Sequence, residues 1–167
     1  MTTIPLRERK LDWLLIAFYA LNLFFITYIV DAEQIIIKDA LHFDYPVWPP
    51  HYFVDMVHEY GTLHDPLQIA RPPWWRATIW IDAILFGPFY AFALYAFAKG
   101  KDWIRTPALL WSAVMMTNVT IILFEERLGA FATPHWPRVL ALNLPWLLMP
   151  VLTIYRMTRS FYPFSKP

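Results

Sequence analysis

The sequence predicts an all-α membrane protein, a four-transmembrane-helix bundle with an extramembrane cap between helices 1 and 2. Hydrophobic residues make up 58% of the 167 residues and charged residues only 16%, whereas soluble domains have about 25% charged residues. The apolar residues fall into four long runs, and a helix of roughly 20 apolar residues crosses the hydrocarbon core of a bilayer. Proline-rich sequence separates the first two runs. The alternative is a soluble helical bundle with an unusually apolar core.

The first predicted span is residues 13–30, a stretch of 18 residues without a charge. A polar lead, residues 1–11, precedes it and carries three basic residues. The apolar run is too long for the hydrophobic region of a signal peptide, and no small-residue cleavage site follows it. We therefore expect a helix that stays in the membrane, with Asp31 at its far end.

Residues 32–73 are the only long segment outside the predicted spans. Six prolines interrupt it, and each one removes a backbone N–H and clashes with the preceding helical turn. The segment is also rich in aromatic residues, which at a membrane surface contact both hydrocarbon and water. We therefore expect it to fold as a cap on the membrane surface rather than as a flexible loop.

Residues 77–98 form the second predicted span, and a single acidic residue, Asp82, lies inside it. No Lys or Arg between Arg76 and Lys99 is available to neutralise this residue. A carboxylate at that depth is costly unless it is protonated, paired or facing a polar cavity. Asp82 is therefore the first candidate functional residue.

The third predicted span begins at Thr106 and Pro107, because Thr favours the N-cap position of a helix and Pro its first turn. Its apolar part ends at Phe124. Gly100, in the basic turn before it, is expected to end the second helix. The fourth predicted span is residues 139–155, and its two internal prolines should kink it and free backbone carbonyls.

The four spans define a membrane domain over residues 12–157 and a tail over residues 158–167. Basic residues are concentrated in the lead, in the loop at 99–105 and in the tail, whereas residues 31–70 contain seven acidic residues and one Lys. The positive-inside rule places such basic segments in the cytoplasm. We therefore expect an integral, multi-pass membrane protein with both termini cytoplasmic.

The composition argues against several classes of function. A net charge of +1 without a basic stripe argues against a nucleic-acid partner. The chain has no Cys and only 4 Gly, which argues against thiol chemistry and against a phosphate-binding loop. His51, Asp55, His58 and Glu59 have helical spacing that could form a metal site, but a solvated face of the cap explains them better. We expect no metal and no cofactor.

Asp31 and Asp82 should lie in the same half of the membrane. Asp31 ends an outward-going helix, and Asp82 lies about one and a half turns into the helix that returns. Two carboxyl groups close together in a low dielectric cannot both ionise, so such a pair holds one proton between them. The alternative for Asp31 is a helix end at the membrane interface.

Two asparagines and a tryptophan could complete a site inside the bundle. Asn118 and Asn143 can point inward and form hydrogen bonds, and Trp146 can offer its ring face to a cation. The alternative role for the asparagines is hydrogen bonding between helices, which polar residues often provide in membranes.

Several stretches of the chain resemble the EXPERA family. The matching stretches are Asp65-Pro-Leu, Pro72-Pro-Trp-Trp, and Lys99-Gly followed by Trp103-Ile-Arg-Thr-Pro-Ala. The similarity covers residues 10–157. It implies a four-helix membrane fold in which a carboxyl pair holds an amine ligand or a sterol in an intramembrane cavity. It also implies a homodimer in the endoplasmic reticulum membrane, if the source is eukaryotic.

The resemblance also implies roles for individual residues. Asp31 falls on the aspartate that pairs with ligands in the family's receptor branch, and Asp82 on its partner glutamate, shortened by one methylene. Phe86, Asn118 and Trp146 fall on further pocket positions.

The sterol-isomerase branch of the family is a second point of comparison. Asn143 and Trp146 resemble the Asn-x-x-Trp pattern of that branch. Thr27, however, occupies the position where the isomerase has a histidine. This departure favours binding over an identical catalytic mechanism.

The first functional expectation is therefore a membrane protein that binds a sterol or isoprenoid-like lipid, and also cationic amphiphiles, between Asp31 and Asp82. The second is a double-bond isomerase in which the same two acids are catalytic and pass a proton through a carbocation. The third is a lipid-trafficking or scaffold protein whose cap contacts a partner.

Overall fold

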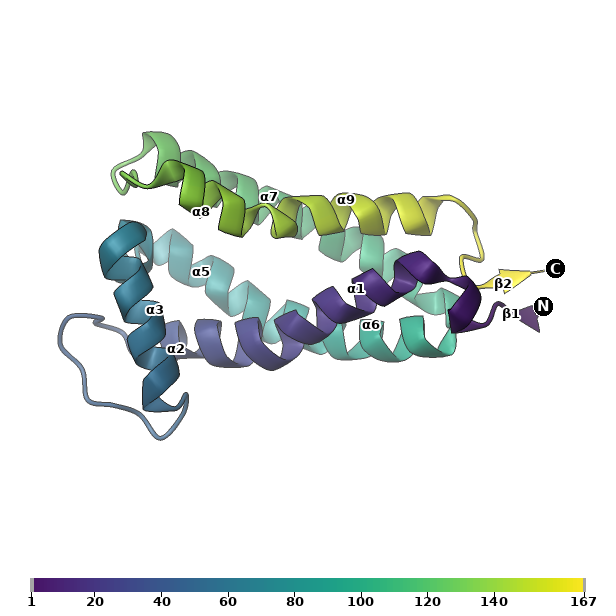
Figure 1. The fold of residues 1–167 in the computed structure, drawn as a ribbon, viewed down its shortest axis with the longest axis horizontal. Helices are drawn as coiled ribbons and strands as arrows, with labels where there is room; N and C mark the ends of the chain where they lie inside the picture. The colour runs from purple at the N-terminus through teal and green to yellow at the C-terminus, as the bar shows by residue number, and fades with distance from the viewer. Residues whose placement is uncertain (1, 167) are drawn as a thin grey trace.

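The computed structural model describes residues 2–166, which fold almost entirely into helices (Figure 1). Four continuous helical stretches in this part of the chain are long and apolar enough to cross a membrane, and they are Lys10–Ile36, Pro73–Lys99, Asp102–Leu128 and Trp136–Thr158. The predicted fold class, an all-α four-helix bundle, is confirmed. The chain is a multi-pass membrane protein.

Each span is built from several helical segments. The first consists of α1 (Lys10–Leu21), η2 (Asn22–Asp31) and α2 (Ala32–Ile36), and the second of α5 (Pro73–Ile81), η3 (Asp82–Phe86) and α6 (Gly87–Lys99). The third consists of η4 (Asp102–Ile104) and α7 (Arg105–Leu128), and the fourth of α8 (Trp136–Asn143) and α9 (Pro145–Thr158). The remaining elements are β1 (Thr2–Thr3), η1 (Leu6–Glu8), α3 (His51–His64), α4 (Pro66–Ala70) and β2 (Ser165–Lys166). The segments η2 and η3 are π-helical, with wider turns than an α-helix.

The spans are longer than the sequence pattern predicts. The first helix continues past Asp31 to Ile36, so Asp31 lies more than one turn inside the helix and not at its end. The cap accordingly begins at residue 37 instead of residue 32. Thr106 is not an N-cap, because η4 leads directly into α7 and Thr106 is already its second residue.

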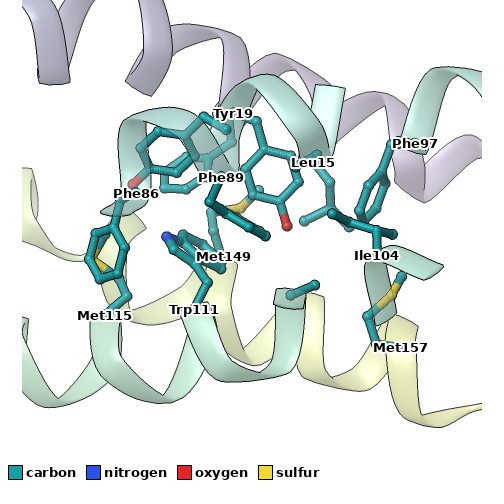
Figure 2. Packing of buried hydrophobic residues seen from close by; sticks show 14 of the residues in the cluster. Leu15, Tyr19, Phe86, Phe89, Phe97, Ile104, Trp111, Met115, Met149 and Met157 are labelled. Atoms are coloured by element: carbon teal, nitrogen blue, oxygen red, sulfur yellow. The ribbon is translucent and has the colours of Figure 1, made fainter. Parts of the chain in front are cut away.

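The bundle has two layers (Figure 1). The first and second spans run side by side in one layer, and α7 and α9 pack together in the other. Aromatic side chains fill the space between the layers (Figure 2). Trp111 stacks on Phe89 with ring centroids 5.2 Å apart, and the Tyr19 hydroxyl lies 2.8 Å from the Thr153 hydroxyl. These contacts fix the layers at the half of the bundle nearer the termini.

The two termini lie at the same end of the bundle (Figure 1), where β1 and β2 pair. Asp12 is fully buried there and binds both Arg9 and Arg156. The Arg156 Nε to Asp12 Oδ1 distance is 2.6 Å. As predicted, Gly100 ends α6, with a φ of 62° that favours glycine.

The cap closes the opposite end of the bundle with α3 and α4 (Figure 1). The buried carboxylate of Glu33 binds Arg71 Nη2 at 2.8 Å and His58 Nε2 at 2.7 Å. This ion pair ties the end of the first span to the cap. It also explains why a charged residue is accommodated in the helix beyond Asp31.

A second pair of acids joins the cap to α7. Asp65 and Glu126 are each 1% exposed, and their carboxyl groups face each other. Asp65 also accepts a hydrogen bond from the backbone N–H of Leu67, which caps α4. Burial raises the pKa of Asp65 above its ordinary value.

Candidate functional site

A cavity of about 280 Å³ lies between the two layers, near the cap. All four spans and the cap contribute residues to its lining. The residues that the sequence predicts as ligand-binding all belong to this lining, and they are Asp31, Asp82, Phe86, Asn118, Asn143 and Trp146. The structure therefore brings the six residues together, while their role in binding stays a prediction.

The two wide-turn segments position the acids. Asp31 is the last residue of η2 and Asp82 is the first residue of η3, and these two segments pack against each other. Wide turns of this kind often occur at functional sites. Asp31 is 7% exposed and Asp82 8% exposed, and their carboxyl groups are direct neighbours.

The surroundings of the two carboxyl groups differ. The Thr27 hydroxyl donates to Asp82 Oδ2 at 2.5 Å, and the Tyr90 hydroxyl donates to Oδ1 at 3.4 Å. Hydrogen-bond donors favour the charged form of a carboxyl group. The arrangement therefore favours Asp82 as the anion and Asp31 as the member that carries a shared proton.

Trp146 and Asn143 come from the break in the fourth span between α8 and α9. The Trp146 Nε1 donates to Asn22 Oδ1 at 2.8 Å, and Asn22 in turn donates to the Phe18 carbonyl at 2.8 Å. This chain of bonds fixes the orientation of the indole ring at the cavity. The Asn143 amide donates to the Val139 carbonyl at 3.0 Å, which leaves its oxygen as an acceptor.

The cap end of the cavity is more polar. Gln34 and Tyr60 line it there, together with Trp75, whose Nε1 donates to Gln34 Oε1 at 2.6 Å. Burial raises the pKa of Tyr60 to about 12. Its hydroxyl therefore stays protonated at neutral pH and can donate a hydrogen bond.

The apolar end of the cavity is bounded by Phe86 and Met115, which lie at the edge of the aromatic core (Figure 2). The site thus combines apolar walls with one carboxyl pair. Such an arrangement can hold a hydrophobic cation, or it can move a proton to and from a buried hydrocarbon.

The four cap residues considered for a metal do not converge. Among residues 2–166 there is no group of three or more side chains that could hold a metal ion. Instead, His58 binds Glu33 at 2.7 Å, and Asp55 accepts a hydrogen bond from the Tyr45 hydroxyl at 2.5 Å.

Sequence reasoning missed several residues that support the site. Thr27 appeared only as a departure from the isomerase pattern, and Asn22 and Tyr90 were given no role. A helical-face argument could have found Thr27 and Gln34, which lie four residues before and three residues after Asp31 and so share its face. No such signal connects Asn22 with Trp146, because 124 residues separate them.

Comparison with known proteins agrees with this architecture. Residues 52–157 match the family model described as EXPERA, the expanded EBP superfamily, and these residues are more than half of the chain. The chain belongs to the EXPERA family. This EXPERA chain is 31% identical to the sigma intracellular receptor 2 of Xenopus tropicalis over 163 residues, which cover 91% of the chain and 90% of the relative.

Two mammalian relatives show the same degree of similarity to this EXPERA protein. The sigma intracellular receptor 2 of Macaca fascicularis and that of Homo sapiens are each 31% identical to it. Each alignment covers 95% of the chain and 93% of the relative. The similarity therefore includes the first span with Asp31, which lies before the residues matched by the EXPERA family model.

Proposed function

We propose that the protein binds a sterol or isoprenoid-like lipid, and also cationic amphiphiles, in the cavity around Asp31 and Asp82. The observation that carries the proposal is a pair of adjoining buried carboxyl groups in a largely apolar cavity. One carboxylate can pair with an ammonium group while the walls bind hydrocarbon. The relatives are named receptors, which supports a binding role.

The two ligand classes would use the cavity differently. An ammonium ion pairs with the carboxylate, whereas a sterol hydroxyl forms hydrogen bonds with a carboxyl group or with Asn118 or Asn143. A volume of about 280 Å³ lies just below the roughly 300–1,000 Å³ range for ligand pockets. A sterol would therefore occupy the cavity with part of its length and extend beyond it.

Neutralising the acids tests this proposal. Asp31→Asn and Asp82→Asn should each weaken binding of a tertiary-amine amphiphile by more than tenfold, which corresponds to about 1.4 kcal/mol. Asp55→Asn, in the exposed part of the cap, is the matched control and should change little. Equal small effects at the three positions in equilibrium binding measurements would argue against a site built on the acid pair.

The second candidate function is a double-bond isomerase. The neutral acid Asp31 would protonate one carbon of an alkene, which leaves a carbocation at the other alkene carbon, and the carboxylate Asp82 would remove a proton from the next carbon beyond that cation, so that the double bond moves by one position. The proton would then pass from Asp82 back to Asp31, so that none is consumed overall. The donors Thr27 and Tyr90 favour Asp82 as the base. The ring of Trp146 could stabilise the intermediate carbocation.

Incubation of the purified protein with a panel of Δ8-sterols, followed by chromatography, separates binding from turnover. In an isomerase, Trp146→Leu should slow the reaction about thirtyfold, because the ring face provides roughly 2 kcal/mol of cation stabilisation. Binding of a neutral sterol should change much less. Absence of product with the wild-type protein across the panel would exclude this candidate and leave the binding function.

We also propose that the protein is a homodimer in the endoplasmic reticulum membrane and that both of its termini are cytoplasmic. A lipid-trafficking or scaffold role remains the third candidate, with the cap as the partner surface. Mass spectrometry of lipids that stay bound after mild purification distinguishes it, since a copurifying sterol supports the first two functions.

A further inference from the structure

The two termini and the cap lie at opposite ends of the bundle (Figure 1). At the terminal end the side chains surround a hollow that is separate from the cavity near the cap. Its volume is about 400 Å³, and η1, the start of α1, the end of α9 and the tail contribute to its lining. We call it the terminal groove. Five basic residues line it, namely Arg9, Lys10, Arg156, Arg159 and Lys166, together with the acid Glu8.

The terminal groove has an excess of positive charge. Asp12, buried beneath it, binds both Arg9 and Arg156 and so neutralises one of them. Lys166 lies 4.0 Å from Glu8 at an exposed position, where such a contact is weak. The five cations therefore face only two carboxylates.

Part of this charge is held in fixed positions. Arg156 Nη1 donates to the carbonyl of Pro163 at 2.9 Å, and Arg9 Nη1 donates to the carbonyl of Phe97 at 2.8 Å. Lys10 and Arg159 are exposed beside these two arginines. The groove thus has a rigid base and two exposed cations at its rim, of which Arg159 lies over the Tyr155 ring, 5.3 Å from its centroid.

The groove also lies where the membrane ends. Lys10 is the first residue of the first span, and the fourth span ends at Thr158, immediately before Arg159. On the membrane side Leu11 and Tyr155 form part of its lining. A ligand that fits this position has an anionic group at the bilayer surface and apolar chains below it, which is the structure of an anionic phospholipid.

We propose that the terminal groove binds the headgroup phosphate of an anionic glycerophospholipid, with Lys10 and Arg159 as its contacts at the rim. The acyl chains run down the bundle beside Leu11 and Tyr155. This site is separate from the cavity near the cap and does not depend on the function proposed for that cavity. It agrees with the predicted cytoplasmic position of the termini, because the cytoplasmic leaflet carries anionic lipids.

The test is a titration of the purified full chain in detergent with dioleoyl phosphatidylserine, and separately with dioleoyl phosphatidylcholine. The wild type should prefer the anionic lipid. The double variant Lys10→Gln/Arg159→Gln should bind it at least tenfold more weakly, because one cation near a membrane surface contributes roughly a fivefold effect. Both side chains are exposed and lie outside the Asp12 ion pairs, so the fold should be retained.

The matched control is Lys99→Gln/Lys101→Gln. It removes the same charge at the same end of the bundle, from exposed positions outside the groove. Equal losses in the two double variants would mean diffuse attraction and overturn the proposal. The same holds if the wild type does not prefer phosphatidylserine, or if the groove variant retains the preference.

A competition arm with soluble glycerol 3-phosphate separates a lipid from a free phosphate. Weak or no competition at millimolar concentration is the expected result, because the acyl chains contribute to binding. Full displacement of the lipid at comparable concentrations would identify the ligand as a soluble phosphate and overturn the lipid assignment. An unchanged temperature of thermal unfolding in detergent verifies that both double variants are folded.

Discussion

At the scale of single residues, the two acids of the cavity are chemically unequal. Asp82 accepts hydrogen bonds from Thr27 and Tyr90, whereas Asp31 has Asp82 as its neighbour. The sequence comparison treats Thr27 as a loss, because the isomerase branch has a histidine at that position. In the structure the Thr27 hydroxyl donates a hydrogen bond to the Asp82 carboxylate.

Replacing that hydroxyl tests its importance. Thr27→Val keeps the shape of the side chain and removes the donor, so the anionic form of Asp82 should be less favoured. Because a hydrogen bond to a charged group contributes about 1.5–3 kcal/mol, we expect amine binding to weaken about tenfold or more. Binding of an amine amphiphile, measured by titration, gives the answer.

Thr78→Val is the control for this substitution. Thr78 also lines the cavity, but its hydroxyl donates to the backbone carbonyl of Trp75 at 2.8 Å. Its replacement should change amine binding little. Similar losses in both variants would mean that the effect comes from packing in the cavity rather than from the acid.

The two acidic residues of the candidate site could be predicted because an ionisable residue stands out in a long apolar stretch of sequence. An acid within an apolar span needs a partner, and the polar residues Asn118 and Asn143 and the ring of Trp146 stand out in the other spans, whereas Phe86 came only from the family resemblance. The supporting hydrogen bonds could not be predicted in the same way. Thr and Asn are common in membrane helices, and although Thr27 shares a helix face with Asp31, nothing in the local sequence shows that its hydroxyl binds Asp82, 55 residues away.

At the scale of elements, the errors in the predicted boundaries have a common cause. Hydropathy stops a helix at its first charged residues, so the first span was predicted to end before Asp31. The helix continues because Glu33 is paired with Arg71 and His58 within the fold. The hydropathy of one helix does not show that its charged residue is paired with residues far away in the sequence.

The acid that caps α4 gives a prediction at this scale. Burial raises the pKa of Asp65, so the folded protein binds this proton more tightly than the unfolded chain. Its stabilising contribution is complete below the unfolded pKa of about 3.9 and is lost as the pH rises through the raised pKa of the folded state. Thermal unfolding in detergent should therefore occur at lower temperature as the pH rises through this window.

The variant Asp65→Asn should flatten this dependence, because the amide resembles the neutral acid. Asp44→Asn, at an exposed position of the same cap, should leave the slope unchanged. An unchanged dependence in Asp65→Asn would show that another group governs the pH response, and Glu126, whose carboxyl group faces Asp65, would be the next one to replace. Tyr60 is not that group, since its pKa of about 12 lies above the window.

At the scale of the whole molecule, the architecture followed from composition and charge. The all-α fold with four spanning helices was predicted correctly, although not the bounds of the spans, because length and apolarity alone determine what can cross a bilayer. The pairing of the first span with the second, and of α7 with α9 (Figure 1), could not be derived. It depends on the fit of side chains such as Trp111 between the layers.

The orientation of the molecule is a prediction for the whole chain. Both termini lie at one end of the bundle, and the positive-inside rule predicts that this end is cytoplasmic. Epitope tags at the N-terminus and after Pro167 should be accessible to antibody after selective permeabilisation of the plasma membrane. A tag near Asp44 should not be. Accessibility of Asp44 alone would reverse the orientation.

The wide turns of η2 and η3 have a consequence for where the helices open locally and exchange their amide hydrogens. A regular spanning helix is best protected from hydrogen exchange at its middle and frays at its ends. Here the ends are tied down, by Asp12 near the termini and by Glu33 near the cap, while π-helical hydrogen bonds interrupt the α-helical pattern between them. Amide hydrogens beside Asp31 and Asp82 should therefore exchange faster than those at the ends, and the bundle should open first at the cavity in which we propose that a ligand binds.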